Sequence, residues 1–158
     1  MVEMDVKISA NDLYDYVLKH AYSGAQGLLG SCVGALLIVV AVLTERWPYI
    51  IFGAILLLYL PCTFFLKSRQ QIVMNPSFQQ PLHYLLNDEG LTVSQGEDSA
   101  CFGWEDMVKA VSTNNSIILY TTAVNATIFP KKQLGDKLPM VIEMISTHMP
   151  PAKVKIRC

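Results

Sequence analysis

The hydrophobic pattern divides the chain into three parts, of which the middle one is the most apolar. Residues 24–43 and 49–66 contain no charged side chain and are rich in Leu, Ile, Val and Ala. Helical runs of about 18 to 20 such residues are long enough to cross roughly 30 Å of hydrocarbon. Neither run has a polar face, and the rest of the chain is too short to bury two such helices. The pattern therefore predicts a transmembrane hairpin over residues 24–66.

The first part, residues 1–23, predicts a short strand followed by a helix. Met4, Val6 and Ile8 alternate with polar residues, which is typical of a half-buried strand. Ser9 and Asp12 have the spacing of a capping box and predict a helix start. This helix is amphipathic. Two positions stay open for it, on the membrane surface or against the later domain.

The third part changes to short apolar runs separated by turn residues at intervals of about ten, which is typical of β-structure. We expect a juxtamembrane linker over 67–81, a domain over 82–150 and a tail over 151–158. The predicted strands are 83–86, 91–95, 99–104, 107–112, 116–122 and 126–129, and the predicted helix is 136–148. The fold class is therefore an α+β membrane protein, in which a transmembrane hairpin precedes a small antiparallel β-roll closed by a C-terminal helix.

Four stretches of this domain resemble the YcxB-like family of bacterial membrane proteins. They are Leu86–Leu91, Trp104–Lys109, Ile118–Tyr120 and Ile128–Lys132. The order of strand, helix, hairpin and β-rich domain resembles the family layout as well. The resemblance implies a membrane location and a pleckstrin-homology-like (PH-like) domain, and it carries over no catalytic residue.

Charge gives the orientation of the hairpin. Its turn holds one basic residue, Arg46, whereas Lys67 and Arg69 follow the second run directly and Lys7 and Lys19 precede the first. Basic residues are enriched on the cytoplasmic side. We therefore expect a multi-pass protein of the inner (plasma) membrane with both termini cytoplasmic.

Small residues form two rows in the first apolar run. Gly30 and Gly34 make a GxxxG pair, and Gly27 and Ser31 belong to a second row at the same spacing. Small residues let helices approach closely in lipid. They predict helix packing, either in a homodimer or, as we favour, against the second helix of the same chain.

The sequence favours a non-enzymatic protein. Glu105 and Asp106 are adjacent, so on a strand they would point to opposite faces and could not act as a pair. We expect Trp104 and Asp106 to form a packed turn instead. His83, His148 and Cys101 belong to no metal-binding or nucleophile motif. We expect no catalytic residue, no metal and no cofactor. A net charge of −1 also argues against nucleic acid as a partner.

The remaining candidates are basic residues that contact lipid or a partner, namely Lys67, Arg69, Lys131 and Lys132. The tail adds Lys153, Lys155 and Arg157. We expect a membrane-tethered binding or scaffolding module, or alternatively an accessory subunit of a membrane transport or signalling complex. Its partners would be the lipid bilayer and either a second copy or an unidentified membrane or cytoplasmic protein.

Overall fold

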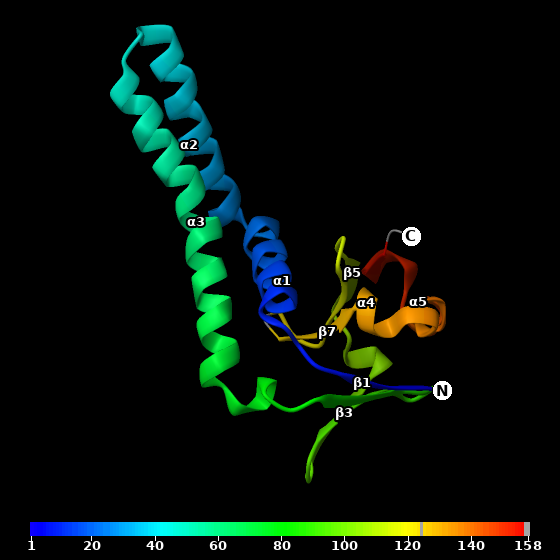
Figure 1. Cartoon of the computed structure of the whole chain (residues 1–158). Coiled ribbons are helices and arrows are strands. Elements are labelled where there is room, and N and C mark those ends of the chain that lie inside the picture. Colours follow the sequence, from blue (N-terminus) through cyan, green and yellow to red (C-terminus); the bar gives the residue numbers. More distant parts are fainter. Residues whose placement is uncertain (124, 157–158) are drawn as a thin grey trace.

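Two four-stranded β-sheets face each other in the computed structural model, which describes residues 1–123 and 125–156 (Figure 1). The strands are β1 (Val2–Val6), β2 (Leu82–Leu86), β3 (Gly90–Gln95), β4 (Asp98–Gly103), β5 (Lys109–Ser112), β6 (Ser116–Tyr120), β7 (Ala126–Pro130) and β8 (Val154–Lys155). The α-helices are α1 (Ala10–Ser23), α2 (Ala25–Thr44), α3 (Trp47–Met74), α4 (Lys131–Leu134) and α5 (Leu138–His148). Short 3₁₀ helices are η1 (Pro76–Phe78), η2 (Trp104–Asp106), η3 (Gly135–Lys137) and η4 (Pro151–Lys153).

The first sheet has the order β1-β2-β3-β4 and is antiparallel throughout. The second has the order β7-β6-β5-β8, with β8 parallel to β5. In the first sheet Val2 lies opposite Leu86 and Val6 lies opposite Leu82. These neighbouring strands are separated in sequence by α1, α2 and α3, so the folded domain is built from residues on both sides of the helical hairpin.

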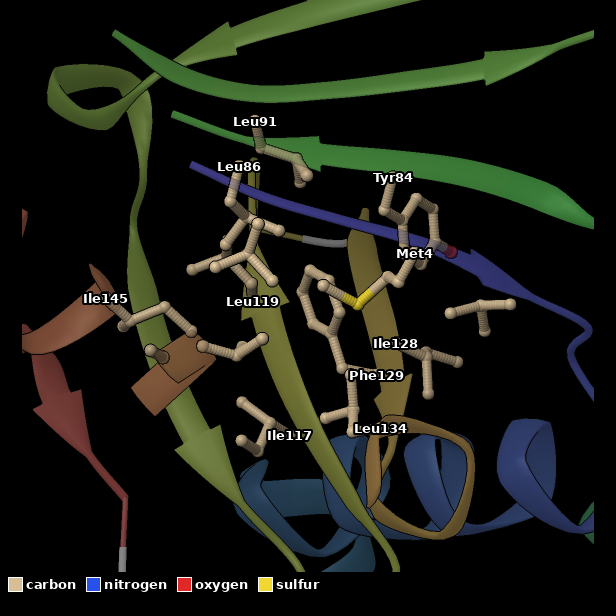
Figure 2. Close-up of a cluster of buried hydrophobic side chains, with 14 of the residues drawn as sticks. Met4, Tyr84, Leu86, Leu91, Ile117, Leu119, Ile128, Phe129, Leu134 and Ile145 are labelled. Atoms are coloured by element: carbon tan, nitrogen blue, oxygen red, sulfur yellow. The ribbon is translucent and has the colours of Figure 1, made fainter. Parts of the chain in front are cut away.

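Apolar side chains from both sheets meet in one core. Strand β1 alternates buried and exposed residues, as its sequence predicts, and all of β6 is buried. Figure 2 shows Tyr84 of the first sheet beside Phe129 of the second, and their ring centroids are 5.1 Å apart. From α5, Val141 and Ile145 are fully buried in the same cluster. The expected β-structure and C-terminal helix are confirmed as a mixed α+β fold.

Helices α2 and α3 are long and apolar enough to cross a membrane, by length and composition. Most of their large apolar side chains are exposed, including Leu36, Ile55 and Leu58. Helices in the core of a soluble protein bury such residues. Helix α3 does not stop at Leu66 but continues to Met74, so the first half of the expected linker is helical. The segment 67–74 has no Gly or Pro to break the helix, which ends before Asn75-Pro76.

Helix α1 packs between the hairpin and the β-sheets. Its capping box is confirmed, because the Ser9 hydroxyl accepts from the Asp12 N–H and the Asp12 carboxylate accepts from the Ser9 N–H at 3.0 Å. On one side, Tyr14 meets Phe65 of α3 edge to face at 5.6 Å. On the other, the Thr113 hydroxyl donates to Asp15. Of its two open positions, α1 takes the one against the later domain.

Two local predictions need correction. The strand expected over 107–112 begins at Lys109, and the strand expected over 99–104 ends at Gly103, because Trp104 belongs to the 3₁₀ turn η2. Helix α5 begins at Leu138 without a side-chain cap, because Asp136 belongs to the preceding turn η3. In the tail, 154–155 add strand β8, whereas Arg157 and Cys158 lie outside the described residues.

We predict that Gly90→Ala destabilises the domain strongly. A Cβ at Gly90 would lie 2.0 Å from the carbonyl oxygen of Phe102 on the neighbouring strand. Overpacking of this kind costs about 3 kcal/mol, which lowers the Tm by roughly 6–12 °C for a chain of this size. Gly96→Ala is the control, because Gly96 has φ +62° but no atom within 4 Å of an added Cβ. It should cost only about 1 kcal/mol. Equal melting temperatures of the two variants in detergent would contradict the close contact.

Candidate binding surfaces

Two of the expected basic residues, Lys131 and Lys153, bind the backbone of their own chain, and so does Lys137. The Lys131 amine donates to the Thr113 carbonyl at 2.6 Å and is partly buried. Lys153 donates to the Met107 carbonyl at 2.9 Å, and Lys137 donates to the Glu3 carbonyl at 2.6 Å. These amines stabilise turns and strand edges, and the bonds of Lys131 and Lys153 are partly buried.

Lys67, Arg69 and Lys132 are exposed, as is Lys155 in the tail. Lys67 and Arg69 lie on α3 directly after its apolar run, and the Arg69 guanidinium carbon is 5.7 Å from the ring centroid of Phe65. This cation–π contact holds Arg69 along the helix. Lys132 lies on the separate helix α4.

The small residues of α2 pack within the chain. An added Cβ at Gly34 would lie 2.8 Å from Leu57, and one at Gly30 would lie 3.4 Å from Leu60, both on α3. At Gly27 it would lie 2.5 Å from the Ala21 carbonyl at the end of α1. Ser31 donates to the Gly27 carbonyl at 3.0 Å. Gly30 and Gly34 therefore face the second helix of the same chain.

A hollow of about 720 Å³ lies where the end of α3 meets the β1–α1 connection and α4. Ile8, Ile72 and Phe78 supply apolar lining. Gln133 bridges its rim, because its amide accepts from the Lys7 N–H at 2.9 Å and donates to the Lys7 carbonyl at 2.8 Å. No pattern in the sequence indicates this hollow, since its walls come from three distant segments.

An aromatic cluster joins α1 to the second sheet. The ring of Tyr120 lies 6.0 Å from Tyr16 and 6.1 Å from His20, centroid to centroid. The Lys109 amine lies 4.4 Å from the Tyr120 ring centroid. Burial, with a smaller contribution from Tyr16, raises the pKa of Tyr120 to about 12. Burial likewise raises the pKa of Tyr16 and of Tyr84 in the core.

The residues considered for catalysis have separate surroundings. His83 contacts two carboxylates of β1, with Nδ1 2.8 Å from Asp5 and Nε2 3.3 Å from Glu3. His148 stacks on Trp104 at 5.1 Å, and its Nε2 lies 3.5 Å from Asp88. The two histidines therefore contact different residues.

Cys101 lies on β4 beside Thr92, with 3.4 Å between the sulfur and the hydroxyl. Glu105 and Asp106 are exposed in η2, in which Trp104 is buried, so the packed turn expected for Trp104 and Asp106 is present. Within residues 1–123 and 125–156, no group of three His, Cys, Asp or Glu side chains is arranged to hold a metal ion.

Strand β4 is the most exposed strand of the domain. Its first four residues are exposed, and its last two are partly buried. The two-residue loop Gly96-Glu97 joins it to β3. Figure 1 shows this β3–β4 hairpin projecting away from the turn between α2 and α3.

Comparison with known protein families matches the region that contains these features. The matching family is described as YcxB-like protein, and the match covers residues 86–140. Residues 86–140 are similar to the YcxB-like family. This YcxB-like region runs from the end of β2 to the start of α5 and holds the β3–β4 hairpin, η2 and α4. It confirms the resemblance but does not include α2 or α3.

No curated protein matches the chain. No solved structure matches it either.

We predict that Lys131→Met and Lys132→Met differ in stability. Lys131→Met removes the bond to the Thr113 carbonyl, which should cost about 1 kcal/mol and lower the Tm by roughly 2–4 °C. Lys132→Met removes an exposed charge and should stay within about 0.5 kcal/mol of the parent. Thermal melting of the two full-length variants in detergent measures the difference. Equal melting temperatures of the two variants, together with weaker binding of Lys131→Met to anionic vesicles, would show that the Lys131 amine binds lipid and does not stabilise the fold.

The raised pKa of Tyr120 predicts a loss of stability at alkaline pH. Tyrosine in an unfolded chain ionises near pH 10. Because Tyr120 in the folded chain ionises only near pH 12, its contribution is complete below about pH 10 and is lost as the pH rises toward 12. Tyr120→Phe should therefore flatten the fall of Tm between pH 9.5 and 11.5, roughly, whereas Tyr22→Phe on α1 should leave it unchanged. An identical fall in Tyr120→Phe and the parent would contradict this assignment.

Proposed function

We propose that this chain is a two-span integral membrane protein whose β-rich domain acts as a membrane-tethered binding or scaffolding module. One observation carries the proposal. Strands β1 and β2 are hydrogen-bonded neighbours, yet the whole α2–α3 hairpin lies between them in sequence. A single crossing would put these strands on opposite sides of a bilayer, whereas two crossings return the chain to its domain.

The exposed surface of the hairpin supports a lipid environment. Apolar side chains project around both helices, and Trp47 and Tyr49 lie at the turn. Water would make this surface an aggregation hazard, whereas hydrocarbon solvates it. Aromatic rings at the turn suit the headgroup level. At 28 residues α3 is roughly 42 Å long, so it spans the core and still reaches the domain.

The order of the strands supports a PH-like roll. The first four strands form one sheet, the next three form most of the second, and α5 then packs against the core. In this interpretation the membrane hairpin is inserted in the connection between the first and second strands of the roll. PH-like rolls are mainly recognition domains, which favours binding over catalysis by analogy of fold.

Charge supports a cytoplasmic position for the domain. Lys67 and Arg69 are exposed where α3 leaves its apolar run, and the α2–α3 turn offers only Arg46. Basic residues next to a span favour the cytoplasmic leaflet and its anionic lipids. Both termini would then lie in the cytoplasm.

Single-cysteine labelling with a membrane-impermeant maleimide tests this topology. One variant keeps only Cys101, on the exposed strand β4, and the other has only Thr44→Cys at the hairpin turn. In intact cells with a permeable outer envelope, we expect Thr44→Cys to react and Cys101 to react only after the inner membrane is opened. Extraction at alkaline pH should leave both variants in the membrane fraction.

The two variants control for each other. The reversed pattern would place the domain outside the cytoplasm and overturn the orientation. Labelling of both positions in intact cells, or of neither, would contradict two crossings.

A further inference from the structure

The edges of the two sheets are protected, with the exception of β4. At the β1 edge, Lys137 binds the Glu3 carbonyl, and Gln133 binds both backbone groups of Lys7. Strand β7 is buried over its last four residues and ends at Pro130, and β8 has only two residues. Exposed edges are usually blunted in such ways, because their free N–H and C=O groups can pair with another chain.

Strand β4 has six residues, pairs with β3 on one side, and has no proline. Its middle, Ser99-Ala100-Cys101-Phe102, carries no charge. Among the described residues, no side chain donates to or accepts from its backbone. Counting from the two-residue loop, we expect the N–H groups of Ser99 and Cys101 to point away from β3. A ladder of hydrogen bonds is therefore open to an extended chain.

The charge around this edge is strongly one-sided. The sequence from 70 to 108 contains no Lys or Arg. Over the same stretch lie six exposed acidic residues, Asp88, Glu89, Glu97, Asp98, Glu105 and Asp106. By the register, Glu97 and Asp98 flank one end of β4, whereas Glu89 and Glu105 lie near the other, where Gly90 pairs with Gly103. Carboxylates therefore stand at both ends of an uncharged edge.

We propose that the β4 edge docks an extended, basic segment of a protein partner, which adds a fifth strand to the first sheet. Backbone hydrogen bonds to β4 hold the segment, and alternate side chains select it. Apolar residues of the segment lie on the side of Ala100 and Phe102, and Lys or Arg residues at its ends meet the carboxylates. This inference deepens the proposed binding module by giving its partner a chemistry.

The negative charge around β4 disfavours a second copy of this chain as the bound strand. Pairing β4 with β4 of another chain would bring two sets of six carboxylates together, and like charges across paired strands are destabilising. An anionic membrane surface is disfavoured for the same reason.

The test uses the full chain in detergent and a labelled, blocked peptide, Lys-Arg-Val-Thr-Val-Thr-Val-Lys-Arg. Fluorescence anisotropy gives its affinity, and hydrogen exchange reports protection of the amides of β4. We expect saturable binding with protection at residues 99–103. A peptide with Glu at its four basic positions, or with Pro at its central Val, should bind at least about tenfold more weakly.

Two matched variants distinguish the contribution of backbone hydrogen bonds to peptide binding from that of side chains. Ser99→Pro removes an outward N–H from the edge and should weaken binding about tenfold, whereas Ser99→Ala keeps that N–H and should bind like the parent. Glu97→Gln combined with Glu105→Gln should weaken binding and reduce its salt dependence. Melting temperatures show whether each variant is folded.

Absence of binding by the folded parent, or equal binding by Ser99→Pro and Ser99→Ala, would overturn the proposal. A dimer of the parent that Ser99→Pro converts to a monomer would assign the edge to a second copy and would also overturn it. Because the assay is in detergent, its failure leaves the labelling test of the membrane tether intact. Conversely, a topology contrary to two spans would leave the peptide result unchanged.

Discussion

The hydrogen-bond ladder between β1 and β2 is the constraint on which the rest of the structure depends. It ties the chain before α1 to the chain after α3, with Val2 opposite Leu86 at one end and Val6 opposite Leu82 at the other. Everything between must leave the sheet and come back to it. The entropy of closing such a loop grows only slowly with its length, so a helical hairpin can be inserted here at modest cost. The buried face of β1 then adds Val2, Met4 and Val6 to the core.

Helix α1 turns this connection into a rigid one. It contacts α3 through Tyr14 and Phe65, and it contacts the second sheet through Tyr16 and Tyr120. A helix packed on both the hairpin and the domain fixes the angle between them, which a flexible linker would not do. The continuation of α3 to Met74 adds a second support and forms one wall of the hollow beside β1. Both α1 and the end of α3 therefore contact the β-rich domain.

Local signals in the sequence predicted much of this fold. The apolar runs gave the two long helices, alternation gave β1, and the Ser9–Asp12 spacing gave the start of α1. These local signals could not predict contacts between segments that are distant in the sequence. Nothing within 1–23 or 82–86 says that these segments pair, and nothing near Lys131 says that its amine reaches the Thr113 carbonyl. The inward bond of Lys131 and the open edge of β4 were therefore missed, because both depend on which segments lie beside them in the fold.

Charge is distributed along the molecule in a way that agrees with these contacts. Lys67 and Arg69 stand where the apolar run of α3 ends, and the acidic β3–β4 hairpin projects away from the α2–α3 turn (Figure 1). An anionic bilayer surface attracts the first group and repels the second. The same carboxylates keep two copies from joining edge to edge, so the open strand does not endanger solubility. The outer backbone groups of β4 can therefore pair with another strand, but the surrounding carboxylates favour only a strand that carries positive charge.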